Sequence, residues 1–82
     1  MSTQILFFGS LADRLGRETT LEIPPEGCTI AELRRRLADR DVASAALLKP
    51  GIRASADQEM VRDEDRVAPG QEISFFPILS GG

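Results

Sequence analysis

The segment TIAELRRRL, residues 29–37, decides the fold expected for this chain. Thr29 and Glu32 have the spacing of a capping box, in which each side chain hydrogen-bonds the backbone N–H group of the other. Apolar positions then recur at steps of three and four along one side: Ile30, Leu33 and Leu37. The spacing predicts one main helix that buries this stripe. We expect the arginine run, residues 34–36, to lie largely toward water as a solvated helix face, with partner docking as the alternative.

Segments on both sides of this helix have the apolar, β-branched and aromatic composition of strands. They are residues 4–8, 19–23, 52–56, 60–61 and 73–77. Residues 5–8 are all apolar, so we expect both faces of this strand to be covered. Two shorter segments, residues 11–15 and 42–48, have the length of brief helices. The order of elements is α+β and predicts a mixed sheet packed against one main helix in a single domain, residues 1–77.

The charge and hydropathy of the sequence argue against two classes of partner, nucleic acids and membranes. Thirteen acidic and ten basic residues give a formal net charge of −3, which argues against binding to nucleic acid. No segment approaches the roughly 20 apolar residues that span a bilayer. Residues 1–8 also lack the charged start of a leader peptide. We therefore expect no membrane partner and a cytoplasmic location.

Side-chain catalysis and metal binding are not expected. The sequence has no histidine, which removes the usual general base and any zinc-like Cys/His cluster. The single cysteine, Cys28, excludes an internal disulfide, and we assign it to packing because no second thiol or base accompanies it. Asp63–Asp65 are three adjacent carboxylates that cannot easily converge on one ion, so we expect a solvated loop there.

The C-terminal end is the candidate site, because Gly81 and Gly82 follow almost directly on the last strand. Glycine lacks a Cβ, so these residues can enter a channel too narrow for side chains. Residues 78–82 are expected to form a flexible tail that reaches about 16 Å when extended. A carboxylate is a poor acyl electrophile, so ATP would first activate it as an adenylate before the acyl group passes to sulfur.

The run FFPILSGG, residues 75–82, resembles the end of the molybdopterin synthase small subunit family, the MoaD-like proteins. Residues 5–8, followed by residues 11–16, are similar to the opening strand and short helix of that family. Residues 29–33 resemble the start of its main helix. The resemblance covers nearly the whole chain and implies a β-grasp, ubiquitin-like fold.

The same resemblance implies a sulfur carrier. Gly82 would be adenylated by a ubiquitin-activating-like enzyme, which uses ATP, and then converted to a thiocarboxylate. The tail would insert into the large subunit of molybdopterin synthase, where sulfur passes to a pyranopterin precursor. The residues entering behind Gly82 would be Ile78, Leu79, Ser80 and Gly81. Catalytic side chains would lie on the large subunit in a heterotetramer, and this chain would bind no cofactor itself.

Aromatic residues near the tail are candidates for partner binding, since interfaces favour aromatic anchors around a dry centre. They are Phe7, Phe75, Phe76 and Pro77, together with the apolar tail residues. Neighbouring strand residues point to opposite faces, so one of Phe75 and Phe76 should lie in the core. The sequence leaves open which of the two is exposed.

Three other functions share these features. A sulfur carrier for the thiazole of thiamin would have the same fold and Gly-Gly end. A ubiquitin-like modifier would join its activated carboxylate to lysines of other proteins. In a plain binding module the terminal glycines would be incidental, and loss of Gly82 would leave its function intact.

Overall fold

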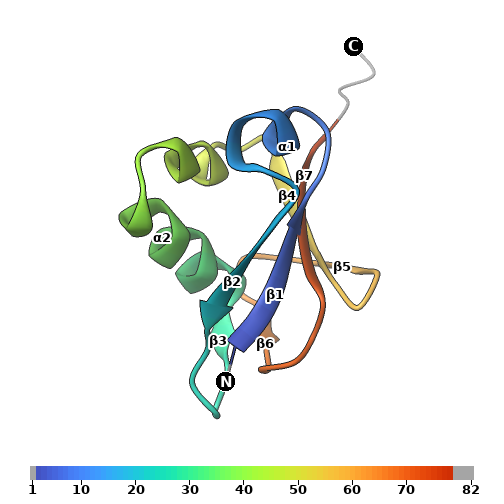
Figure 1. Ribbon diagram of the computed structural model, residues 1–82. Helices are drawn as coiled ribbons and strands as arrows, with labels where there is room; N and C mark the ends of the chain where they lie inside the picture. Colours follow the sequence, from blue (N-terminus) through green and yellow to red (C-terminus); the bar gives the residue numbers. More distant parts are fainter. Residues whose placement is uncertain (1, 79–82) are drawn as a thin grey trace.

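The computed structural model describes residues 2–78 (Figure 1). The elements in chain order are β1 (Ser2–Phe7), α1 (Ser10–Leu15), β2 (Glu18–Glu22), β3 (Cys28–Thr29), α2 (Ile30–Arg40), the 3-10 helix η1 (Ala43–Leu48), β4 (Ile52–Ala56), β5 (Glu59–Val61), β6 (Arg66–Val67) and β7 (Ile73–Pro77). The expected strands and short helices are confirmed to within a few residues. Leu79, Ser80, Gly81 and Gly82 of the expected tail lie outside the described residues.

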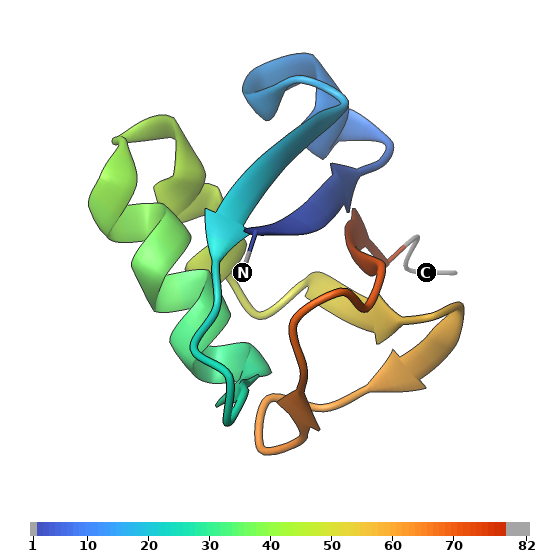
Figure 2. The ribbon, with the colours of Figure 1, turned by 60° about the horizontal axis from the view of Figure 1, so that its bottom comes forward.

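Five strands form one mixed sheet in the order β2-β1-β7-β4-β5, and β3 pairs with β6 in a small second sheet. The neighbouring strands β1 and β7 are parallel to each other. β2 is antiparallel to β1, β4 is antiparallel to β7, and β5 is antiparallel to β4. Figures 1 and 2 show α2 and η1 on one side of this sheet, with α1 at one end of it. A single main helix against a mixed sheet is the predicted β-grasp arrangement, which is confirmed.

The predicted capping box begins α2. The Glu32 N–H group donates to Thr29 Oγ1 at 3.1 Å, and the Thr29 N–H group donates to Glu32 Oε1 at 3.1 Å. The Thr29 hydroxyl also donates to Glu32 Oε1, at 3.0 Å. The backbone and hydroxyl bonds that Thr29 donates favour the charged carboxylate, so they lower the pKa of Glu32. The predicted stripe of Ile30, Leu33 and Leu37 is fully buried against the sheet. Local hydrogen bonding and burial therefore agree on where this helix begins and which side it buries.

Only one face of β1 is covered, so the expectation of two covered faces was wrong. Burial alternates along the strand: Thr3, Ile5 and Phe7 are buried, Ser2 and Gln4 are exposed, and Leu6 is half-buried. The helices pack on a single side of the sheet, so every second residue of β1 faces away from the core. Leu6 thus brings an apolar side chain to the open face of the sheet.

The arginine run is only partly solvated. Arg35 and Arg36 are exposed as expected, but Arg34 is buried, with 9% of its surface accessible. It lies four residues after Ile30 and three before Leu37, so helical spacing places it on the apolar side of α2. The expectation for Arg34 was wrong because its position on the helix, and not its residue type, decides its burial.

The acidic run 63–65 forms hydrogen bonds within its own loop and with α2. Asp63 Oδ1 accepts from Arg34 Nε at 2.9 Å, and Asp65 Oδ2 accepts from the Arg62 N–H group at 2.8 Å. Asp63 and Glu64 are exposed and Asp65 is half-buried. The carboxylates fix the path of the loop between β5 and β6.

Candidate functional site

The end of β7 is held from both sides as the chain approaches its terminus. On one side the Phe8 N–H group donates to the Phe75 carbonyl at 3.1 Å. On the other, the Ile78 N–H group donates to the Gly51 carbonyl at 2.9 Å. Backbone bonding therefore continues one residue past β7, to Ile78. We expected the domain to end at Pro77 and the tail to begin at Ile78. That the residues after Ile78 form a flexible tail stays a prediction.

A tight turn packs against the same end of β7. Gly9 has φ +61°, a backbone conformation that favours glycine. A Cβ atom at Gly9 would lie 3.1 Å from Cγ of Pro77, closer than side chains normally approach. The turn between β1 and α1 thus contacts the last residue of β7 and fixes the position from which the tail leaves.

The expected partner-binding role of Phe7 and Phe75 is corrected by the structure. Both side chains are buried, at 3% and 0% exposure, and their ring centroids lie 6.4 Å apart in the core. Alternation along β7 directs the neighbouring Phe76, which is half-buried, to the open face. Pro77 is also half-buried, against Gly9. Of the four expected docking residues, Phe76 and Pro77 are therefore the ones with accessible surface.

Phe8 was missed by the sequence analysis. Its side chain is 51% exposed and continues the outward row of β1 after Leu6. Alternation places Phe8 on the face opposite Thr3, Ile5 and Phe7, but only the burial of those three residues shows that this face is the open one. A hollow of about 460 Å³ lies beside it. Its lining residues are Leu6, Phe7, Phe8, Gly9, Ala12, Arg17 and Glu18.

The open face of the sheet carries an apolar patch, which we call the open-face patch. It consists of Leu6, Phe8, Met60, Phe76 and Ile78. Strand register places Leu6 beside Ser74, Ser74 beside Ser55, and Ser55 beside Met60, in one row across four strands. Met60 is 57% and Ile78 46% exposed. Met60 lies on the edge strand β5, whereas Phe8, Phe76 and Ile78 lie at the end of β7 from which the chain continues. Accessible aromatic and aliphatic side chains of this kind are typical of an interaction surface.

Neither a metal-binding cluster nor an accessible thiol is found among the described residues. Within residues 2–78 no three His, Cys, Asp or Glu side chains gather as a metal site. Cys28 is buried, and this burial raises the pKa of its thiol, which fits the expected packing role. No helix in the described part of the chain is long and apolar enough to cross a membrane. The functional groups to consider are therefore the open-face patch and the residues that continue from β7.

Known proteins resemble the chain along almost its whole length. Residues 5–82 match the ThiS family. The molybdopterin synthase sulfur carrier subunit of Escherichia coli (strain K12) is 29% identical over 80 residues, covering 96% of this chain and 98% of that protein.

Two solved structures show the ubiquitin-like fold. SAMP1 of Haloferax volcanii, also called small archaeal modifier protein 1, is 24% identical with a TM-score of 0.77, and the match covers all of both chains. Caldiarchaeum subterraneum ubiquitin is 20% identical with a TM-score of 0.60, covering 100% of this chain and 98% of that one.

Proposed function

Since the chain belongs to the ThiS family, we propose that it is a sulfur carrier, the small subunit of a cytoplasmic molybdopterin synthase, acting through the carboxylate of Gly82. One observation carries the proposal. The chain matches the E. coli sulfur carrier subunit over 96% of its length and ends in Gly-Gly four residues after β7. The central position of β7 in the sheet supports it, because a strand paired on both sides gives the tail a fixed base.

The chemistry starts with the Gly82 carboxylate. One carboxylate oxygen attacks the α-phosphorus of ATP on a ubiquitin-activating-like enzyme, and pyrophosphate leaves. Sulfide-level sulfur, supplied by a partner as HS⁻, then attacks the glycyl carbonyl carbon, AMP leaves with the bonding electron pair, and the sulfur loses its proton. The resulting thiocarboxylate would be carried to the large subunit, where its sulfur passes to the pyranopterin precursor. All catalytic side chains in this scheme belong to partners. The carrier supplies the acyl group and a tail long enough to bring that group into a partner's active site.

A protein modifier is the second candidate, and the full-length structural match to SAMP1 favours it. It would use the same glycyl adenylate, but a lysine amine of another protein would attack the carbonyl and form an amide. A carrier that delivers sulfur to a thiazole is a third candidate and differs only in the acceptor. The three candidates share the activation step. The modifier differs from the two carriers in the nucleophile that attacks the adenylate, and the two carriers differ in the acceptor of the sulfur.

Intact-mass spectrometry tests the proposal. The chain with a native C-terminus is incubated with the activating enzyme, ATP and a sulfur source. We expect a mass increase equal to the exchange of one oxygen for one sulfur. Amide adducts to added proteins, without that exchange, would favour the modifier. An unchanged mass, with an enzyme shown to be active on another carrier, would refute both.

The open-face patch should dock the activating enzyme, and Phe8→Ser tests this role. Phe8 is half exposed, so its loss should cost little stability but remove an aromatic anchor beside the tail. We expect adenylation at limiting carrier concentration to slow about tenfold, as for a moderate hot spot. The readout is the initial rate of pyrophosphate release.

Val42→Ser is the matched control for Phe8→Ser. Val42 is 92% exposed and follows α2, away from the patch. It should leave the rate unchanged. Equal rates for the two variants would show that the patch takes no part in activation.

A further inference from the structure

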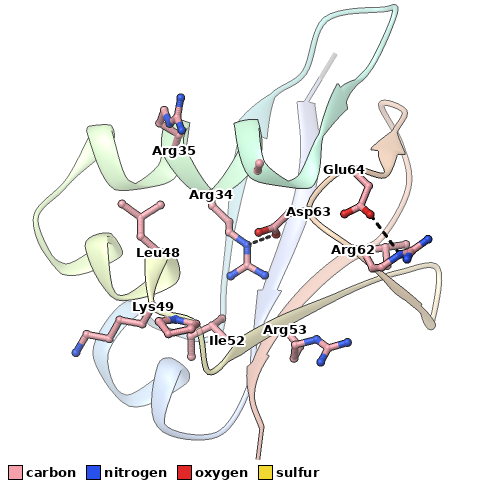
Figure 3. A pocket seen from close by; sticks show the side chains of 12 residues that line it. Arg34, Arg35, Leu48, Lys49, Ile52, Arg53, Arg62, Asp63 and Glu64 are labelled. Atoms are coloured by element: carbon pink, nitrogen blue, oxygen red, sulfur yellow. Dashed lines mark hydrogen bonds and ion pairs between the residues drawn. The ribbon is translucent and has the colours of Figure 1, made fainter.

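A second surface feature lies on another part of the molecule. Between α2, the segment after η1, the start of β4 and the loop after β5 is a pocket of about 390 Å³ (Figure 3). Its lining residues are Ala31, Arg34, Arg35, Leu48, Lys49, Pro50, Ile52, Arg53, Val61, Arg62, Asp63 and Glu64. We call it the cationic pocket.

Charge distinguishes this pocket from the rest of the chain. Its lining includes five of the ten cationic residues but only two of the thirteen acidic ones, in a chain whose net charge is −3. Both acids already have partners in it: Asp63 lies 2.9 Å from Arg34, and Glu64 lies 3.6 Å from Arg62. The pocket is therefore a local region of positive potential on an acidic protein.

Two cations of the pocket remain available. Within residues 2–78 the side chains of Arg35 and Lys49 form no ion pair or hydrogen bond. Both are exposed, whereas Arg53 pairs with Phe76 in the strand register and therefore directs its side chain to the open face. Arg35 and Lys49 can therefore pair with an incoming anion without giving up a bond inside the protein.

The pocket also has apolar surface. Figure 3 shows Leu48 between Arg35 and Lys49, while Arg53 and Arg62 lie toward the opposite side. Leu48 is 55% exposed, and Ile52 and Val61 are half-buried. The two available cations thus flank Leu48 along one side of the pocket, and they do not converge on one point, as donors to a single small oxyanion would. Spaced carboxylates on a peptide, with an apolar side chain between them, match this arrangement.

We propose that the cationic pocket binds an acidic segment of a partner protein, with an apolar side chain of that segment packed on Leu48. The pocket lies beside the base of the tail, because Ile52 pairs with Pro77 and Gly51 accepts the hydrogen bond from Ile78. A partner that receives the tail can therefore reach the pocket as well. The inference goes beyond the proposed function and depends on the charge of the pocket, not on the chemistry of Gly82.

The test is a titration of the ¹⁵N-labelled full chain with the peptide acetyl-Glu-Glu-Leu-Glu-Glu-amide, followed by NMR. We expect the largest amide shift changes in residues 48–53 and 61–64. The double variant Arg35→Gln/Lys49→Gln should weaken binding about fivefold, since each exposed ion pair contributes modestly. Raising the ionic strength from about 0.05 to about 0.3 M should weaken it further. Leu48→Ser should also reduce the affinity for the peptide. Because this variant leaves the charge unchanged, it measures the apolar contact alone.

The control removes the same charge elsewhere. Arg17→Gln/Arg36→Gln changes two exposed arginines outside the pocket and should bind the peptide like the unaltered chain. Equal losses in the two double variants would overturn the proposal, as would equal binding of acetyl-Gln-Gln-Leu-Gln-Gln-amide. Tighter binding of pyrophosphate at the same amides would assign the pocket to small oxyanions instead. Removing Gly82 should not change peptide binding, so this result is independent of the carrier chemistry.

Discussion

Deletion of Gly82 is expected to abolish activation and sulfur loading while leaving the fold intact. The shortened chain still ends in a glycine carboxylate, but that group sits one residue, about 3.3 Å, short of its position in the full chain. A misplacement of even 1 Å can cost about 10²-fold in rate, so we expect at least that loss in adenylation. Pyrophosphate release measures the first step, and the oxygen-to-sulfur mass change measures the second.

Stability provides the control for this deletion. The last backbone bond among the described residues belongs to Ile78, so every bond between described residues remains when Gly82 is removed. Its thermal midpoint should equal that of the full chain. Activation at an undiminished rate would show that the terminal glycine is incidental and would favour a plain binding module.

Much of this fold was predictable because local and long-range preferences agree. The capping box at Thr29 and the buried spacing of Ile30, Leu33 and Leu37 identify α2 without knowledge of its partners. β7 was predicted from its apolar and aromatic residues, which fit a central strand. These signals depend on neighbours within one helical turn or strand, which the sequence displays directly.

The site was less predictable because it depends on which face of each strand is covered. An apolar run such as Ile5–Phe8 has no polar residue to mark the open side, so Phe7 was chosen where Phe8 is exposed. Choosing between Phe75 and Phe76 required the packing of helices against the sheet. The cationic pocket joins residues from distant segments, and no local pattern marks it.

Arg34 connects α2 to this packing, and Arg34→Ala is expected to destabilise the domain by about 2–4 kcal/mol. Its Nη1 donates to the buried Leu47 carbonyl at 2.7 Å, and its Nε donates to Asp63 Oδ1 at 2.9 Å. The guanidinium carbon lies 5.3 Å from the centre of the Phe75 ring. The variant would leave the Leu47 carbonyl without this donor and remove the cation from the face of a core aromatic ring. For a domain of this size the thermal midpoint should fall by roughly 10–25 °C.

Two variants separate the position of Arg34 from its charge. Arg35→Ala removes the same residue type from the exposed neighbouring position and should change stability by less than about 0.5 kcal/mol. Asp63→Asn keeps an acceptor for Arg34, and Asp63 is largely solvated, so its effect should be intermediate. The chain has no Trp or Tyr, so urea unfolding is followed by far-UV circular dichroism. Equal stability of the Arg34→Ala and Arg35→Ala variants would show that Arg34 is a solvated surface residue. A larger loss for Arg34→Ala is expected only if Arg34 forms its bonds inside the fold.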